Sequence, residues 1–277
     1  MGSRILLPIA TYPDSTPTSA LEAMTTLAAM LGAQVTAVVH NVDIPQLHNP
    51  AAEFVLKLEA ASEAAEALSR SKGLELSDML GQLCRQANVT LTIEFFKSER
   101  PAGEKIAARA RSFDLTMMAC QLDSPDHALL LEEVLFGSGA PVILFPQEAS
   151  SSRSLDVVAV AWDGGRAAAR ALRDALPVIA QAGRVRLLTC SEDKPIARGS
   201  IDEISAFLSS HEVAVEHVPF GLEGKAIGEA LQSAALAQDA NLLVMGAYGH
   251  SRVREFLLGG ATASVIKAPK LPTLLSH

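Results

Sequence analysis

Short apolar runs alternate along the chain with longer stretches in which apolar residues recur every three or four positions. The runs Arg4–Ala10 and Asp156–Ala161 are bounded by turn residues and are too short for helices, so we expect strands buried on both faces. A helical pattern follows each run, over 18–31 and 167–181. Because strands alternating with helices favour parallel sheets with right-handed crossovers, the pattern predicts an α/β protein.

The order of these elements repeats, which predicts two copies of one unit in tandem. A glycine ends each first helix, Gly32 and Gly183, and the two glycines are 151 positions apart. A long helical stretch over 51–86 in the first half corresponds to a shorter one over 200–210 in the second. The other expected strands are 34–39, 89–96, 115–119, 142–145, 185–190, 213–220, 242–246 and 273–275, and the other expected helices include 103–112, 225–238 and 263–267.

The boundary between the two units is marked by a small, polar stretch around 147–152, which is typical of a linker. The expected domains are therefore residues 1–148 and 153–277. Each is long enough to bury its own core. We expect each to hold an open, mostly parallel five-stranded sheet with helices on both faces.

Length and composition agree with this organisation. The length of 277 residues suits two domains. Hydrophobic residues make up 49 % of the chain and aromatic residues 4 %, which is an ordinary composition for a globular protein. No window approaches the roughly 18 uninterrupted apolar residues of a membrane span. The first residues run into a strand without the long apolar stretch of a signal peptide. We therefore expect a cytoplasmic protein without a membrane partner.

The formal net charge of −8 is carried by the first half of the chain. Residues 1–150 contain 10 Lys and Arg against 18 Asp and Glu, whereas residues 151–277 contain 13 of each. An acidic half repels polyanions, and neither half has a basic run, so nucleic acid is not an expected partner. Charge alone favours the second half for an anionic ligand.

The residue types that often carry metal or catalytic chemistry are scattered. Cys84, Cys120 and Cys190 lack metal-ligand spacing and are expected to be structural thiols. The seven histidines include no HExxH motif, and no Ser/His/Asp set or carboxylate pair can be identified from spacing. We therefore expect no metal site and no catalytic residue.

One loop has a pattern suited to holding phosphates. Gly246 ends an apolar strand, Gly249 follows three positions later, and Gly259 comes ten positions further on, before a helical stretch. Glycines let the backbone approach a ligand closely, and free N–H groups at a helix start attract anions. In parallel α/β sheets, ligands bind where loops leave the carboxyl ends of the strands. The loop is therefore a candidate phosphate-binding loop.

This run resembles the signature of the universal stress protein family, in particular its nucleotide-binding branch: Gly-x2-Gly-x9-Gly followed by Ser or Thr. The flanking stretches 248–252 and 256–259 also look like family members, and the order of strands resembles the family over nearly the whole chain. The resemblance implies two tandem Rossmann-like domains of the adenine nucleotide alpha hydrolase-like type. Gly260 departs from the signature, since it stands where the family prefers a hydroxyl, which Thr262 could supply instead.

The resemblance also implies a site for ATP, with or without Mg²⁺, around this loop. Asp163 corresponds to a family aspartate near the nucleoside, and a turn or helix-cap role is the alternative interpretation. Cys190 and Met245 end two strands, where they would contact the base or belong to the core. The implied nucleotide-binding residues are Asp163, Cys190, Met245, Gly246, Gly249, Gly259, Gly260, Ala261 and Thr262.

The first half lacks the same pattern. Ala119 and Leu122 stand at the first two signature glycines, and the next matching glycine, Gly137, lies 18 positions after Ala119 instead of 13. Carboxylates surround this loop and would repel a phosphate. Asp14 keeps an acid after the first strand. We expect no nucleotide in the first half.

The sequence thus predicts a tandem universal stress protein that binds ATP or a related adenine nucleotide in its second domain. Its expected role is sensing or regulation in a stress response, with at most weak ATP hydrolysis. A module that has lost ATP binding and holds another partner, and a slow ATP hydrolase, are the alternatives. In this family domains pair through their last strands, so 142–145 and 273–275 are expected to meet within the chain; a further homodimer stays open.

Overall fold

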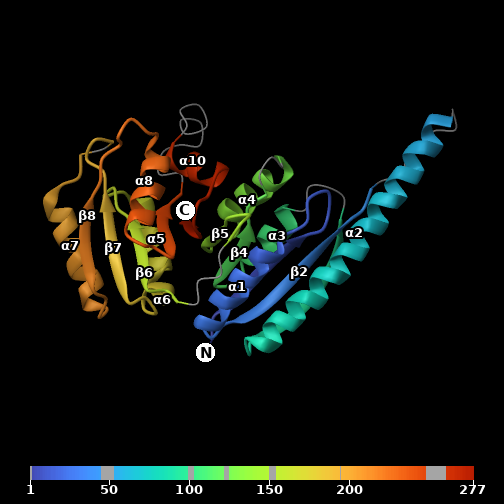
Figure 1. Cartoon of the computed structure of the whole chain (residues 1–277), viewed down its shortest axis with the longest axis horizontal. Coiled ribbons are helices and arrows are strands. Elements are labelled where there is room, and N and C mark those ends of the chain that lie inside the picture. The colour runs from blue at the N-terminus through green and yellow to red at the C-terminus, as the bar shows by residue number, and fades with distance from the viewer. Residues whose placement is uncertain are drawn as a thin grey trace.

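A computed structural model of the chain describes residues 2–44, 53–98, 103–121, 125–149, 154–193, 195–247 and 260–277. Its strands form one sheet of ten, covered by helices on both faces (Figure 1). In spatial order the strands are β3 (Thr90–Ser98), β2 (Gln34–Val42), β1 (Arg4–Ala10), β4 (Leu115–Ala119), β5 (Val142–Phe145), β10 (Thr273–Ser276), β9 (Leu242–Gly246), β6 (Val157–Ala161), β7 (Arg184–Thr189) and β8 (Val215–Pro219).

The helices connect the strands as the α/β pattern predicts. They are α1 (Thr18–Met30), α2 (Glu53–Gln86), α3 (Gly103–Ala110), α4 (Pro125–Gly137), α5 (Arg166–Asp174), α6 (Leu176–Ile179), α7 (Arg198–Ser210), α8 (Ile227–Ala237) and α10 (Ala261–Lys267). Both halves show the same strand order around their first strand, with the second and third strands on one side and the fourth and fifth on the other. The predicted fold class, an open and mostly parallel α/β sheet, is confirmed.

The two halves are joined in the middle of the sheet. Within each half all paired strands are parallel, but β10 runs antiparallel to β5, with Leu274 opposite Ile143 and Leu275 opposite Val142. The last strands of the two halves therefore lie side by side. Because the direction reverses at this pair, the carboxyl ends of the first-half strands and those of the second-half strands lie at opposite edges of the sheet.

The core consists of two layers, one on each face of the sheet. Successive residues of a strand point to opposite faces, so neighbours in β10 belong to different layers. Leu274 packs with Ile143 in the layer under α1, α2, α5, α6 and α7, whereas Leu275 packs with Leu144 in the layer under α3, α4, α8 and α10. Each layer thus includes residues from both halves, and the hydrophobic core does not divide where the repeat does.

Polar and ring contacts also cross between the halves. The Arg170 guanidinium donates to the Gly139 carbonyl oxygen at 3.3 Å. The rings of Phe136 and His277 meet edge to face, with centroids 4.8 Å apart. The Cys120 thiol lies 3.8 Å from the Ile266 carbonyl oxygen. These contacts surround the β5–β10 pair and support it.

The predicted helix over 167–181 is wrong as a single element. It is divided into α5 and α6, which meet at Ala175. Pro177 lies in the first turn of α6, where its missing N–H costs nothing, whereas inside a continuous helix it would remove a hydrogen bond and clash with the preceding turn. The apolar period continues through Pro177, but the proline ends the single helix that this period alone predicts.

The long helix predicted for the first half is confirmed as α2. Its 34 residues correspond to a length of about 50 Å. Figure 1 shows that its amino-terminal end projects beyond the sheet, while its later turns lie along β2. Leu76, Leu80 and Cys84 on those later turns are buried in the core.

The three cysteines are free and buried, as expected from their spacing. Burial raises the pKa of the Cys84 thiol, despite a hydrogen bond with Thr25, and raises that of Cys120 to about 11. Both thiols therefore stay protonated at neutral pH and behave as small core residues. Among the described residues, no helix is both long and apolar enough to cross a membrane.

We expect Leu274→Ala to destabilise both halves together. The side chain is fully buried in the layer shared by the halves, so its truncation should lower the free energy of unfolding by about 2–5 kcal/mol. Urea unfolding followed by Trp162 fluorescence, which reports the second half, and by far-UV circular dichroism should give coincident transitions. Leu236→Ala, at a side chain that is 43 % exposed, is the control and should cost less than about 1 kcal/mol. Two separate transitions would contradict the shared core.

Candidate functional site

The candidate site lies at the end of β6, the strand from which the later strands of the second half are added first on one side and then on the other. β6 has β9 on one side and β7 on the other, and ligands of open α/β sheets bind in the crevice at such a point. Ala161 at the end of β6 pairs with Leu188 of β7, and Val160 pairs with Val244 of β9. The residues that follow these three strands therefore gather at one edge.

Asp163 follows β6 at this edge and its side chain is exposed. One carboxylate oxygen, Oδ1, accepts a hydrogen bond from the Gly165 N–H at 2.7 Å, just before α5 begins. Gly164 between them has φ +72°, a conformation that favours glycine. The turn interpretation of Asp163 is thus present in the structure, and the same turn holds the carboxylate at the site edge.

Cys190 and Met245 are placed at the ends of β7 and β9 and are almost fully covered, 7 % and 4 % exposed. Met245 belongs to the core layer under α8 and α10, together with Leu231 and Val265. The core interpretation of Met245 is therefore satisfied by its packing. A contact of either side chain with a base stays a prediction.

Gly246 ends β9 in close contact with the start of α5. A Cβ atom at this position would lie 2.5 Å from the Ala167 carbonyl carbon and 2.6 Å from the Ala168 nitrogen, both backbone atoms. Real Cβ atoms essentially never approach so closely, so glycine is needed here for the packing of α5 on β9. The first signature glycine thus has a role in the fold that does not depend on a ligand.

The far end of the signature loop is the start of α10. Gly260 is its N-cap, with φ −55° and ψ 168°, and the cap lacks a side-chain hydrogen bond. The helix begins at Ala261, two residues before the sequence-based start. Thr262 in α10 is only 3 % exposed, and a contact of its hydroxyl with a phosphate stays a prediction. Gly249 and Gly259 lie outside the described residues.

Two residues at this edge were not identified from the sequence. The Ala247 N–H, directly after β9, donates to the Ser276 carbonyl oxygen at 2.7 Å. The Nδ1 atom of His277 lies 3.1 Å from the Ala247 carbonyl oxygen. Ser276 and His277 are these two residues. No sequence motif marks them, because only the pairing of β10 with β9 brings them next to Ala247. Within the described ranges, no group of three or more His, Cys, Asp or Glu side chains is arranged to hold a metal ion.

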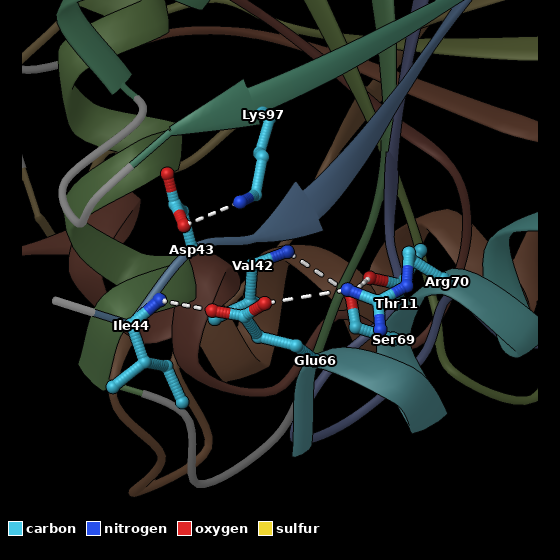
Figure 2. A network of polar contacts seen from close by, with 8 residues as sticks. All are labelled: Thr11, Val42, Asp43, Ile44, Glu66, Ser69, Arg70 and Lys97. Carbon is cyan, nitrogen blue, oxygen red and sulfur yellow. Dashed lines mark hydrogen bonds and ion pairs between the residues drawn. The ribbon is translucent and has the colours of Figure 1, made fainter. Parts of the chain in front are cut away.

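The corresponding edge of the first half is covered by α2, as Figure 2 shows. Ser69 of α2 accepts a hydrogen bond from the Val42 N–H at 3.0 Å, and its hydroxyl lies 2.7 Å from that of Thr11. Because Thr11 donates its own hydrogen to the His40 carbonyl oxygen, Ser69 is the donor between the two hydroxyls. The ends of β1 and β2 are thus tied to α2.

The network continues outward along the same edge (Figure 2). Glu66 of α2 accepts a hydrogen bond from the Ile44 N–H at 3.0 Å and pairs with Arg70. Lys97 at the end of β3 pairs with Asp43 after β2 at 2.6 Å. Side chains of α2 are therefore bonded to residues at the ends of β1 and β2 in the first half.

The first-half counterpart of the signature loop leads into α4, which contains His127. This side chain is 9 % exposed, and its burial lowers the histidine pKa to about 4. The ring is therefore neutral in the folded protein at physiological pH.

Comparison with known proteins agrees with this geometry. Residues 155–277 match the model of the Universal stress protein family. A universal stress protein of Synechocystis, Slr1230, is 37 % identical over 73 residues, which are 25 % of this chain and 25 % of that protein. The match thus spans about a quarter of that relative's length.

Solved structures extend the likeness in fold to nearly the whole chain. A universal stress protein from Archaeoglobus fulgidus has a TM-score of 0.71 at 19 % identity, covering 99 % of this chain and 96 % of its own. A putative universal stress protein from Pseudomonas aeruginosa has a TM-score of 0.57 at 16 % identity, covering 99 % and 92 %. At these identities the likeness concerns the fold.

Fold and family match together define a universal stress protein domain in the second half of the chain. The family match applies to residues 155–277, and the likeness of the rest of the chain to universal stress proteins is one of fold.

Gly246→Ala should destabilise the protein even without a ligand. The added methyl group would meet the α5 backbone, and such overpacking costs about 1–3 kcal/mol. Gly199→Ala is the matched control, since a Cβ at Gly199 has nothing within 4 Å and alanine favours the helix α7. Thermal unfolding of both variants measures the difference. Equal stabilities would show that α5 is not held close to β9.

The buried His127 should make stability depend on pH. The histidine pKa is about 4 when folded and about 6.5 when unfolded, so only the unfolded chain takes up a proton between these values. The neutral, buried His127 therefore contributes fully to the free energy of unfolding above pH 6.5. This contribution is lost as the pH falls towards 4, by about 3 kcal/mol in all. Urea unfolding at pH 7 and pH 5 should show a smaller pH effect in His127→Leu than in the wild type. His211→Gln, at an exposed histidine, should keep the wild-type pH dependence.

Proposed function

We propose that the second half of the chain binds an adenine nucleotide, ATP with or without Mg²⁺, and that binding serves sensing or regulation in a stress response. The site is the edge formed by the ends of β6, β7 and β9 and the start of α10. The chain divides for this purpose into a first domain, residues 1–148, and a second domain, residues 153–277.

The observation that carries this proposal is the position of the exposed Asp163 at the end of β6, beside the end of β9 where the signature stretch begins. Ala247 leaves β9 directly beside the strand that Asp163 follows, since β6 and β9 are neighbours. The loop ends at Gly260, where α10 starts. Gly246, Gly249 and Gly259 have the spacing of nucleotide-binding family members, and they lie in the part of the chain that matches the family. The Asp163 carboxylate would accept hydrogen bonds from ribose hydroxyls or the adenine amine.

The difference between the halves also favours a nucleotide in the second. Residues 151–277 carry equal numbers of acidic and basic residues, whereas residues 1–150 have a net charge of −8. A polyphosphate is repelled less by the neutral half. In the first half, Ser69 and Glu66 of α2 are bonded to the strand ends, so a ligand there would have to displace these contacts. We propose that the first domain binds no nucleotide and acts through its contact with the second.

The proposed activity is retention of the nucleotide rather than turnover. Hydrolysis of ATP needs a water molecule positioned by a base. The carboxylate of Asp163 at the site edge is engaged with the Gly165 N–H, which suits it for binding in a fixed orientation. A single-turnover measurement of phosphate release tests this part of the proposal directly.

Calorimetric titration with ATP and Mg²⁺ should show one site per chain. Asp163→Asn keeps an oxygen for the Gly165 N–H but removes the charge, so nucleotide affinity should fall about tenfold or more. Asp14→Asn is the matched control after the first strand of the other half and should bind as the wild type does.

Gly260→Ser restores the hydroxyl of the signature at a backbone conformation that serine adopts readily, so ATP should bind several-fold more tightly.

The alternatives are separated by the same measurements. An absence of heat at millimolar ATP would rule out the nucleotide proposal and leave an interaction module that holds another partner. Phosphate release by the wild type that is lost in Gly249→Val would replace retention by slow hydrolysis. Equal loss of affinity in Asp163→Asn and Asp14→Asn would show that the site does not lie at the β6 edge.

A further inference from the structure

A cavity in the second half lies between α5 and α7, on the face of the sheet away from α8 and α10. Its volume is about 170 Å³. It exists because α7 is loosely packed: of its thirteen residues Leu208 alone is buried, while Ile204 and Phe207 are partly buried against the core. The cavity opens to solvent between these two helices, and none of the implied nucleotide-binding residues lines it.

The walls of the cavity are apolar and aromatic. Leu172 and Ala169 of α5 form one side, and Ile204 and Phe207 of α7 form the other. Trp162 forms the end nearest the sheet. Its indole N–H donates to the Ser200 hydroxyl at 3.1 Å, so the only polar atom of the indole is already satisfied. An apolar occupant would therefore leave no buried donor unpaired at Trp162.

The mouth of the cavity carries one charge of each sign. Arg173 of α5 and Glu203 of α7 both line it and both are exposed. The Arg173 guanidinium lies 6.0 Å from the centroid of the Phe207 ring, so it already stands over an aromatic surface. A charged ligand would be attracted by one of these groups and repelled by the other. An uncharged polar substituent can accept from Arg173 and donate to Glu203.

We propose that this cavity binds a small single-ring aromatic compound with one uncharged hydrogen-bonding group, of the phenol class. An apolar cavity of about 150 Å³ holds a benzene ring, so the volume of about 170 Å³ suits one ring. Trp162 and Phe207 provide aromatic contacts for it, and the substituent lies between Arg173 and Glu203. The site is separate from the proposed nucleotide site and does not rest on nucleotide binding.

Phenol is the test ligand, and Trp162 is the reporter, since it is the only tryptophan of the chain. Tryptophan emission is followed at an excitation wavelength where phenol absorbs little, with full-length protein and without nucleotide. We expect a saturable change with a Kd of about 1–10 mM, as befits a ligand of few atoms. A change that rises linearly without saturation, or no change, would overturn the proposal.

Ala169→Leu fills the cavity from α5 and should weaken phenol binding at least tenfold. Ala237→Leu places the same substitution at an exposed position of α8 and should bind as the wild type does. Wild-type affinity in Ala169→Leu would refute the site. Circular dichroism and thermal unfolding confirm that both variants are folded.

A second comparison does not depend on filling the cavity. In the wild type, benzoate should bind several-fold more weakly than phenol, because its carboxylate has no hydrogen to donate to Glu203 and the repulsion by Glu203 offsets the attraction by Arg173. Glu203→Gln removes that repulsion at an exposed side chain and should strengthen benzoate binding about threefold or more while changing phenol binding little. If benzoate binding does not respond to Glu203→Gln, the charged mouth is not part of the site.

Discussion

The antiparallel pairing of β5 with β10 is the contact on which the rest of this structure depends. It continues the two five-stranded halves into one sheet and lets both hydrophobic layers run across the boundary between the repeats. Neither fifth strand is left as an open edge, where unpaired N–H and C=O groups invite association with other chains. The reversal of direction at this pair also places the strand ends of the two halves at opposite edges. A ligand in the second half is thus remote from the corresponding edge of the first.

The two halves share a strand order but differ at the carboxyl ends of their strands. In the second half α7 is short, and the end of β7 is followed by the exposed turn after Cys190. In the first half β2 continues to Val42, and the longer α2 reaches the strand ends with Ser69 and Glu66. The longer helix thus adds internal hydrogen bonds at the edge of the first half that corresponds to the candidate site. The first half packs against the second through the shared core.

The signature residues are not a uniform set. Gly246 is required by the approach of α5 to β9, and Met245 is part of the core, so both positions would be constrained in a protein that bound nothing. Asp163 and Gly260 are different, because the former is exposed and the latter is a helix cap without a side-chain bond. Substitutions at these two positions therefore test the proposed ligand binding, whereas those at Gly246 test the packing of the fold first. Signature residues that the fold itself requires therefore have to be separated from the others before a signature match is used as evidence for ligand binding.

The alternation of apolar runs and helical periods determined the α/β class, the repeat and nearly every strand, because these depend on local patterns of burial. The spacing of Gly246, Gly249 and Gly259 likewise predicts a ligand-binding stretch between β9 and α10, whose two ends the structure describes. The break of the 167–181 helix at Pro177 could have been predicted, because a proline inside a helical pattern is itself a local signal. Local patterns could not show that Ser276 and His277 reach Ala247, or that Ser69 is bonded to the first-half strand ends. Those contacts join residues far apart in the chain, so only the packing of strands and helices in three dimensions decided them.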